Sequence, residues 1–79
     1  MRLLVFFDLP TKSDLDRKRY VKFRRFLLQD GYRMLQYSVY ARFCNGLDAV
    51  AKHQQRLEDR APGKGSIRLM VVTDKQYGE

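Results

Sequence analysis

The chain of 79 residues suffices for one domain with a modest core, and its longest apolar run, Leu3 to Phe7, is far shorter than the roughly 20 residues of a membrane-spanning helix. A formal net charge of +7 favours an anionic polymer as the partner, and residues 1–45 hold ten of the 16 basic residues but only four of the nine acidic ones. The single cysteine, Cys44, predicts a structural thiol in a reducing, cytoplasmic compartment.

The first predicted element is a strand over residues 3–8, because five apolar residues run up to Asp8 and Pro10 ends the segment. A short run without polar alternation is typical of a central strand. The turn-forming stretch TKSDLD follows. In it, Ser13 and Asp16 have the spacing of a capping box, with Asp in place of the usual Glu.

The stretch LDRKRYVKFRRFLLQDG, residues 15–31, predicts an amphipathic helix that ends before Gly31. The residues expected on its apolar face are Leu15, Tyr20, Phe23, Phe26 and Leu27. Its basic side chains lie mostly away from that face. A basic face is common on solvated helices, and it also suits contact with a phosphate backbone, which requires Lys and Arg but no sequence readout.

Residues 32–43, YRMLQYSVYARF, favour β structure because they are rich in Val, Tyr and Phe. They form either one long strand or two strands with a reversal near residues 36–38. No Asn-Gly or Asp-Gly pair marks a turn there, so both alternatives remain open at this point. The tyrosines of the chain could stack on unpaired bases, although most are expected in the core or an interface.

A second helix is predicted over residues 47–60, followed by the break APGKG and a strand over residues 66–74. The thin apolar stripe of this helix consists of Leu47, Val50, Ala51 and Leu57. The only histidine, His53, lies among polar residues of the same helix and is expected to face solvent.

If residues 32–43 form two strands, the order is βαββαβ, which is a ferredoxin-like α+β fold in a single domain over residues 1–79. Two helices would then cover one face of an antiparallel sheet. The other face would stay open and apolar, which predicts a partner, most simply a second copy of the chain in a homodimer.

Asp8 has two interpretations. A carboxylate after a strand commonly starts a turn, and Asp30 and Asp74 are read in the same way. Alternatively, Asp8 is a ligand of Mg²⁺, which takes hard oxygen ligands. The chain holds no Asp-x-Asp, His-x-His or Glu-x-x-His pattern, so one copy would hold the ion weakly. A two-fold dimer would supply two Asp8 carboxylates for one ion.

The stretches VFFDLP, RYVKFRRFLLQDGYRMLQYSVYARF and GSIRLMVVTDKQY, in this order, resemble the CRISPR-associated endoribonuclease family, the small protein "two" of CRISPR spacer acquisition. The residues of these stretches are most similar to those of members that accompany type II systems. The resemblance implies a ferredoxin-like homodimer and therefore two strands in residues 32–43. It also implies that Asp8 is the metal-binding and catalytic residue, with Mg²⁺ near the two copies, and that RNA or double-stranded DNA is cleaved.

The resemblance further implies that the dimer bridges two dimers of the CRISPR integrase beneath a captured duplex. Family chains usually continue into a further strand that packs on the partner subunit, and this chain, which stops at Glu79, is expected to lack it. The residues expected from charge alone to neutralise the nucleic-acid backbone are Arg17, Arg24, Arg25 and Arg42.

The leading hypothesis is therefore a nucleic-acid-binding homodimer of CRISPR adaptation with a Mg²⁺-dependent phosphodiesterase site at Asp8. The alternative is a non-catalytic adaptor that bridges the integrase and duplex DNA. A more distant alternative is a small-ligand regulatory domain, which is disfavoured because neither CNG nor APGKG resembles a phosphate-binding loop.

Overall fold

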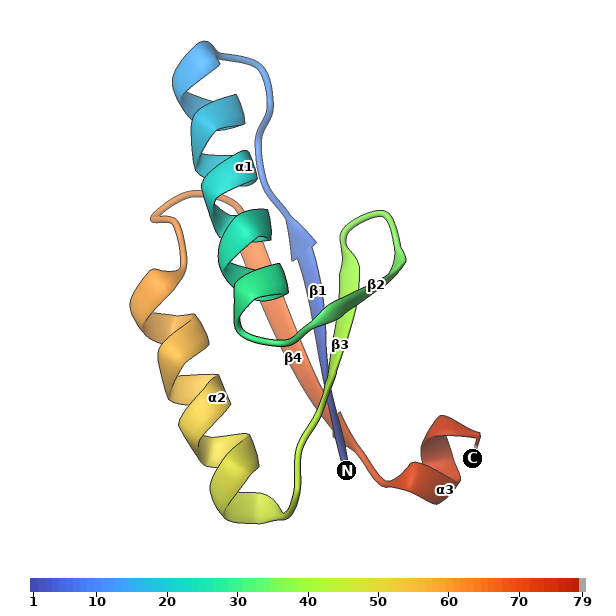
Figure 1. Cartoon of the computed structure of the whole chain (residues 1–79). Helices are drawn as coiled ribbons and strands as arrows, with labels where there is room; N and C mark the ends of the chain where they lie inside the picture. Colours follow the sequence, from blue (N-terminus) through green and yellow to red (C-terminus); the bar gives the residue numbers. More distant parts are fainter. Residues whose placement is uncertain (79) are drawn as a thin grey trace.

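A computed structural model describes the backbone of residues 1–78 as four strands and three helices (Figure 1). The elements are β1 (Arg2–Asp8), α1 (Asp14–Gln29), β2 (Arg33–Gln36), β3 (Val39–Phe43), α2 (Leu47–Arg60), β4 (Ser66–Val72) and α3 (Asp74–Tyr77). The sheet order is β2-β3-β1-β4, and every neighbouring pair is antiparallel. This confirms the ferredoxin-like α+β fold. It also decides between the two alternatives for residues 32–43, which form two strands.

The strand β1 lies in the centre of the sheet, as predicted, between β3 and β4. Its side chains alternate: Leu3, Val5 and Phe7 are buried, whereas Leu4 and Phe6 are half-buried. The buried set points toward α1 and α2, which both cover the same face of the sheet (Figure 1). The intervening set, together with Asp8, therefore projects from the opposite, uncovered face.

The turn between β2 and β3 is fixed against the end of β1. Ser38 adopts a φ of 64°, a left-handed conformation that Asn or Gly would more commonly supply. The backbone N–H of Phe7 donates a hydrogen bond of 3.1 Å to the carbonyl oxygen of Ser38. The chain thus reverses at Ser38 without a local turn motif, and the hydrogen bond to β1 holds this turn in place.

The helix α1 begins with the predicted capping box. The backbone N–H of Asp16 donates to Ser13 Oγ over 3.0 Å, and the N–H of Ser13 donates to an Asp16 carboxylate oxygen over 3.5 Å. Phe23 and Leu27 are buried, as predicted, but Leu15 is 56% exposed. The prediction for Leu15 is wrong because the first turn of α1 extends beyond the end of the sheet (Figure 1).

The helix α2 buries Val50 and Leu57, as predicted, but Leu47 and Ala51 are exposed. The third buried residue of this helix is His53, which is only 5% exposed, so the prediction that it faces solvent is wrong. Burial is tolerated because His53 Nδ1 lies 2.8 Å from a carboxylate oxygen of Asp30, at the end of α1.

The last strand is shorter than predicted: β4 ends at Val72, and Thr73 caps the short helix α3. The N–H of Gln76 donates to Thr73 Oγ1 over 3.1 Å. Asp74 lies in the first turn of α3 and accepts hydrogen bonds from the amino terminus over 3.2 Å and from Arg2 over 2.9 Å. These contacts join the start of β1 to the segment that follows β4.

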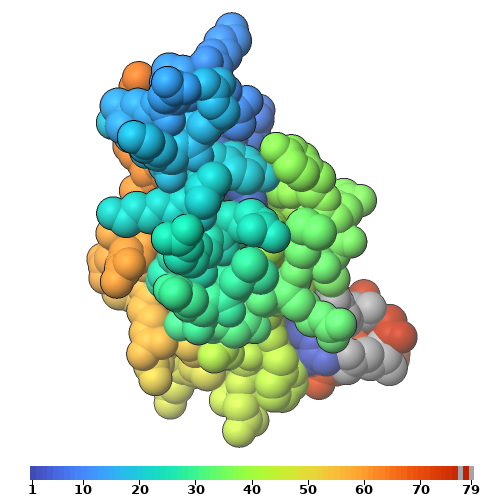
Figure 2. All heavy atoms as spheres, turned by 45° about the horizontal axis from the view of Figure 1, so that its top comes forward, coloured from blue at the N-terminus to red at the C-terminus, as the bar shows by residue number. Residues whose placement is uncertain are grey.

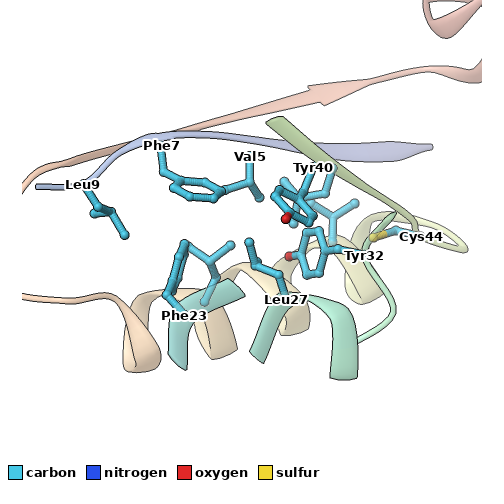
Figure 3. Close-up of a cluster of buried hydrophobic side chains, with 11 residues drawn as sticks. Val5, Phe7, Leu9, Phe23, Leu27, Tyr32, Tyr40 and Cys44 are labelled. Carbon is cyan, nitrogen blue, oxygen red and sulfur yellow. The ribbon is translucent and has the colours of Figure 1, made fainter. Parts of the chain in front are cut away.

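The core lies between the sheet and the two long helices (Figure 3). Phe7 and Val5 extend from β1 toward Phe23 and Leu27 of α1, and the rings of Phe7 and Phe23 meet edge to face with centroids 5.2 Å apart. Cys44 is buried in this cluster, as expected for a structural thiol. In the part of the chain that is described, no helix combines the length and apolar character needed to span a membrane.

Candidate active site

Asp8 is the last residue of β1 and lies exposed on the open face of the sheet. The pairing of β1 with β4 sets Ser66 opposite Asp8 and Arg68 opposite Phe6, so these side chains share that face. Together they border a shallow depression of about 250 Å³. Its lining residues are Phe6, Phe7, Asp8, Ser38, Val39, Ser66 and Arg68.

The backbone of Asp8 is held by close packing with Gly65, the residue that precedes β4. A Cβ atom at Gly65 would lie 2.5 Å from the carbonyl oxygen of Asp8 and 3.0 Å from the Cα atom of Leu9. Only a residue without a side chain permits this approach. Gly65 therefore fixes the position of the Asp8 backbone, from which the carboxylate projects.

The donor set around Asp8 suits Mg²⁺ in type but is small in number. The carboxylate is exposed beside an open depression, so bound phosphates and waters could complete a shell of hard oxygen ligands. Within the described residues, no group of three or more His, Cys, Asp or Glu side chains comes together. Among the residues that line the depression, Asp8 is the one carboxylate.

The other candidate carboxylates are used elsewhere in the structure. Asp30 accepts hydrogen bonds from His53 and from Arg56, the latter over 2.9 Å, and its side chain is 10% exposed. Asp74 is paired with the amino terminus and Arg2. His53, the single histidine of the sequence, is hydrogen-bonded to Asp30 at the C-terminal end of α1 and does not line the depression beside Asp8.

The open face around Asp8 is apolar. Leu4 and Phe6 lie in its centre and are half-buried, and the strand pairing sets Met70 opposite Leu4 and Phe43 opposite Arg2. Met70 and Phe43 are 52% and 53% exposed, and the Arg2 guanidinium lies 4.7 Å from the centroid of the Phe43 ring. Exposed apolar patches on proteins commonly mark interaction sites.

The basic side chains of α1 lie on the other side of the sheet layer from Asp8. Figure 2 shows the outer surface of α1, coloured from blue to teal, beside the green β2–β3 hairpin. A broad depression of about 610 Å³ runs along this surface. Its lining residues are Asp14, Arg17, Lys18, Val21, Lys22 and Arg25. Arg17 and Arg25 therefore lie in one exposed basic strip.

The remaining predicted arginines have protein partners. Arg24 Nε donates to the Tyr40 hydroxyl over 3.1 Å. Arg42 is half-buried and donates to the carbonyl oxygens of Asp30 and Phe43 over 2.5 and 2.6 Å. Arg17 itself binds Asp14 and two backbone carbonyls of the preceding loop. Nucleic-acid binding by these four residues stays a prediction.

Sequence reasoning missed Arg68 and Ser66 as neighbours of Asp8. They lie nearly 60 residues away along the chain, and only the antiparallel register of β1 with β4 brings them to the same edge. The local sequence carries no signal of this pairing, because Asp8 ends β1 and Ser66 begins β4, and the two strands are connected to different helices.

The model of the family "CRISPR associated protein Cas2" matches residues 1–79. The CRISPR-associated endoribonuclease Cas2 of Acidovorax ebreus (strain TPSY) is 58% identical over 77 residues, which cover 98% of this chain and 76% of that protein. The protein of the same name from Parvibaculum lavamentivorans is 41% identical over 78 residues, covering 99% and 77% of the two chains.

Among solved structures, Streptococcus pyogenes Cas2 at pH 6.5 superimposes with a TM-score of 0.70, covering 92% of this chain and 87% of that one at 23% identity. This likeness supports the ferredoxin-like fold. Because the family model spans the whole chain and two relatives exceed 40% identity over nearly all of it, the chain belongs to the CRISPR-associated Cas2 family.

Proposed function

We propose that two copies of this chain form a Mg²⁺-dependent phosphodiesterase that cuts nucleic acid during CRISPR spacer acquisition, with the two Asp8 residues as its metal ligands. The observation that carries the proposal is the exposed Asp8 carboxylate, which projects from the edge of an apolar open sheet face. The relatives, which carry the name endoribonuclease, supply the reaction class.

The homodimer is supported by the character of the open face. Leu4, Phe6 and Met70 form its centre, and about half of the surface of the Met70 side chain is exposed to solvent. Burying such a face against a copy of itself removes apolar area from water. A two-fold axis near the end of β1 would bring the two Asp8 carboxylates toward one ion.

Three polar residues of the depression have distinct tasks in this proposal. Asp8 holds the ion, and Arg68, on the neighbouring strand, neutralises a phosphate oxygen of the bound strand. The Ser66 hydroxyl, opposite Asp8, orients the phosphodiester by a hydrogen bond. When bound, Mg²⁺ polarises the scissile phosphate and activates a water.

The strongly basic composition supports nucleic-acid binding beyond the cutting site. Arg17 and Arg25 lie in the exposed strip along α1, and we propose that they contact the phosphate backbone, with Arg24 and Arg42 contributing from its border. We further propose the CRISPR integrase as a protein partner and the cytoplasm as the compartment, where a lone buried thiol such as Cys44 stays reduced.

The test is metal-dependent cleavage by the wild type and by Asp8→Asn, with both proteins shown to be dimers at the assay concentration. Cleavage of labelled RNA should fall at least about 100-fold in Asp8→Asn, as expected when a metal ligand is lost. Asp48→Asn removes an exposed carboxylate from α2 and should leave cleavage unchanged. Equal cleavage by wild type and Asp8→Asn would refute the assignment.

One observation favours a second function, that of a non-catalytic adaptor between integrase and duplex DNA. The described residues hold neither a cluster of three metal ligands nor a histidine beside Asp8. An adaptor would bind duplex DNA with a steep loss of affinity as salt rises, and Asp8→Asn would bind it as the wild type does. Measured duplex affinity and cleavage in the same samples separate the two functions.

A further inference from the structure

The tip of the β2–β3 hairpin carries an aromatic ring that is held in place but open to solvent. The side chain of Tyr37 is 73% exposed, more than any other large hydrophobic side chain among the described residues. Its ring stacks on Tyr20 of α1 with centroids 5.9 Å apart and an angle of 18° between the planes. Because Tyr20 covers one face of the ring and most of the side chain is exposed, the opposite face is open.

This ring is the outer end of a ladder that starts in the core. Tyr20 packs on Phe7 with ring centroids 5.6 Å apart, and Phe7 is 5% exposed. The hydroxyl of Tyr20 lies 3.4 Å from Ser38 Oγ, and the carbonyl oxygen of Ser38 accepts a hydrogen bond from the N–H of Phe7. Tyr37 therefore has a defined position, which lowers the entropy cost of binding a flat ligand.

The ladder begins at the residue next to Asp8. Phe7 and Asp8 point to opposite faces of the sheet, and Ser38, adjacent to Tyr37, lines the same depression as Asp8. Figure 1 shows the β2–β3 turn beside the end of β1. Ser38, the residue after Tyr37, thus joins the tip of the hairpin to the depression that Asp8 lines.

The electrostatic character of the ring suits contact with a polyanion. Hydrogen bonding with Tyr20, and then the electrostatic interaction with the Tyr20 hydroxyl, raise the pKa of Tyr37 above its ordinary value. A tyrosine with its ordinary pKa of about 10 is already a neutral phenol at physiological pH, and this shift acts in the same direction. A neutral aromatic face stacks on any base, whereas the interior bases of a duplex already have both faces covered.

We propose that Tyr37 is a stacking platform for an unpaired nucleobase, which sets the adjoining phosphodiester beside Asp8 and selects single-stranded segments for cleavage. This inference deepens the proposed nuclease function of Asp8 and rests on it. The Tyr37 side chain acts as a positioning group, because it binds a base and takes no part in the bond that breaks. Duplex binding along α1 uses different side chains and is independent of Tyr37.

The test separates binding from cleavage by using the Asp8→Asn chain, in which the cutting site is disabled. Single-stranded RNA carrying 2-aminopurine is titrated into this chain and into the versions that also carry Tyr37→Phe or Tyr37→Leu. Stacking quenches 2-aminopurine, so quenching is expected with Tyr37 and with Tyr37→Phe. Tyr37→Leu should lose the quenching and bind the single strand about 5- to 10-fold more weakly, the lower end of the range for one stacked base.

Two controls address folding and specificity. Duplex RNA of the same length should bind equally to all three proteins, which shows that the Leu variant retains its fold and its basic surface. A fully abasic strand of the same length should bind the protein that retains Tyr37 more weakly than the intact strand does, and its affinity should not change in Tyr37→Leu, because it offers no base to stack. The first of these comparisons needs no substitution at Tyr37.

Unchanged quenching and affinity in Tyr37→Leu, or a fully abasic strand that binds the Tyr37 protein as tightly as the intact strand does, would overturn the stacking proposal. Neither result depends on cleavage, so the proposed nuclease function would survive it. Conversely, full cleavage by Asp8→Asn would remove the assignment of Asp8 as the metal ligand of the cutting site and leave the binding results intact. In that case the platform would hold single strands for a purpose other than cutting at Asp8.

Discussion

Replacing Gly65 with alanine should displace the backbone of Asp8 and destabilise the fold. Gly65 has a φ of +86°, which an L-residue with a side chain rarely adopts, and its Cβ would approach the carbonyl oxygen of Asp8 to 2.5 Å. The carbonyl oxygen belongs to the main chain, and a Cβ atom is attached rigidly to it, so no side-chain rotation can relieve the contact. Relief therefore requires that the end of β1 and the start of β4 move apart.

The expected loss has two parts. The left-handed conformation costs an alanine about 1–2 kcal/mol, and overpacking against a neighbouring backbone costs about 1–3 kcal/mol. The loss of roughly 2–5 kcal/mol compares with a total stability of about 4–12 kcal/mol for a chain of this length. The variant should remain folded at low temperature, but with Asp8 shifted relative to Ser66 and Arg68.

The assay is urea unfolding at one fixed protein concentration, because dimerisation would make the midpoint concentration-dependent. Gly63→Ala is the matched control in the same loop: it has no positive φ, and no atom lies within 4 Å of its Cβ position. It should change stability by less than about 1 kcal/mol. If Gly65→Ala were as stable and as active as Gly63→Ala, the close packing of Gly65 on Asp8 would be refuted.

Three further predictions concern the core and its polar groups. Tyr32→Phe deletes a buried hydroxyl that has no partner among the described residues, so urea unfolding should show unchanged stability or a gain of up to about 1 kcal/mol. Burial, and then the charge of Asp30, raise the pKa of Tyr32. The unfolded chain therefore loses this proton first, and wild-type stability should fall as the pH rises above about 10, less so in Tyr32→Phe. Leu27→Ala removes a fully buried side chain and should cost about 2–5 kcal/mol by the same measurement, whereas a loss below 1 kcal/mol would contradict the packing. Asp30→Ala removes the acceptor of both His53 and Arg56 and should cost about 2–4 kcal/mol, well above the cost of Arg56→Ala, since the Arg56 side chain is half exposed.

The sequence predicted the elements whose local pattern decides them. The apolar run of β1 and the Ser13–Asp16 capping box are local signals, and both appear in the structure. The β2–β3 turn could not be decided from the residues alone, because Ser38 supplies the positive φ without a turn motif. The resemblance to a known family settled that point, and the strand pairing confirms it.

The errors arise where one element determines the environment of another. His53 has polar neighbours in the sequence and was expected in solvent, but Asp30, 23 residues away, gives it a buried partner. Leu15 fits the apolar period of α1, yet the sheet ends before it can cover that side chain. A helical pattern specifies which side chains share a face, and it does not specify how far the opposing layer extends.

The same limit applies to the candidate site. Asp8 was identified from its place after a buried run, but Arg68 and Ser66 join it only through the β1–β4 register. Charge alone also treats all arginines as equivalent. The structure separates Arg17 and Arg25, which are exposed and line the basic strip, from Arg42, which is half-buried against the backbone of Asp30 and Phe43.

The central claim is that one metal site requires an Asp8 from each of two copies, and mixed dimers test it most directly. Wild type and Asp8→Asn are unfolded together, refolded in varied ratios and assayed for Mg²⁺-dependent RNA cleavage at constant total protein. If both carboxylates are needed, cleavage follows the square of the wild-type fraction, and about a quarter remains at equal mixing. Activity that falls in direct proportion, with about half remaining at equal mixing, would show that each Asp8 works alone and would contradict the paired site.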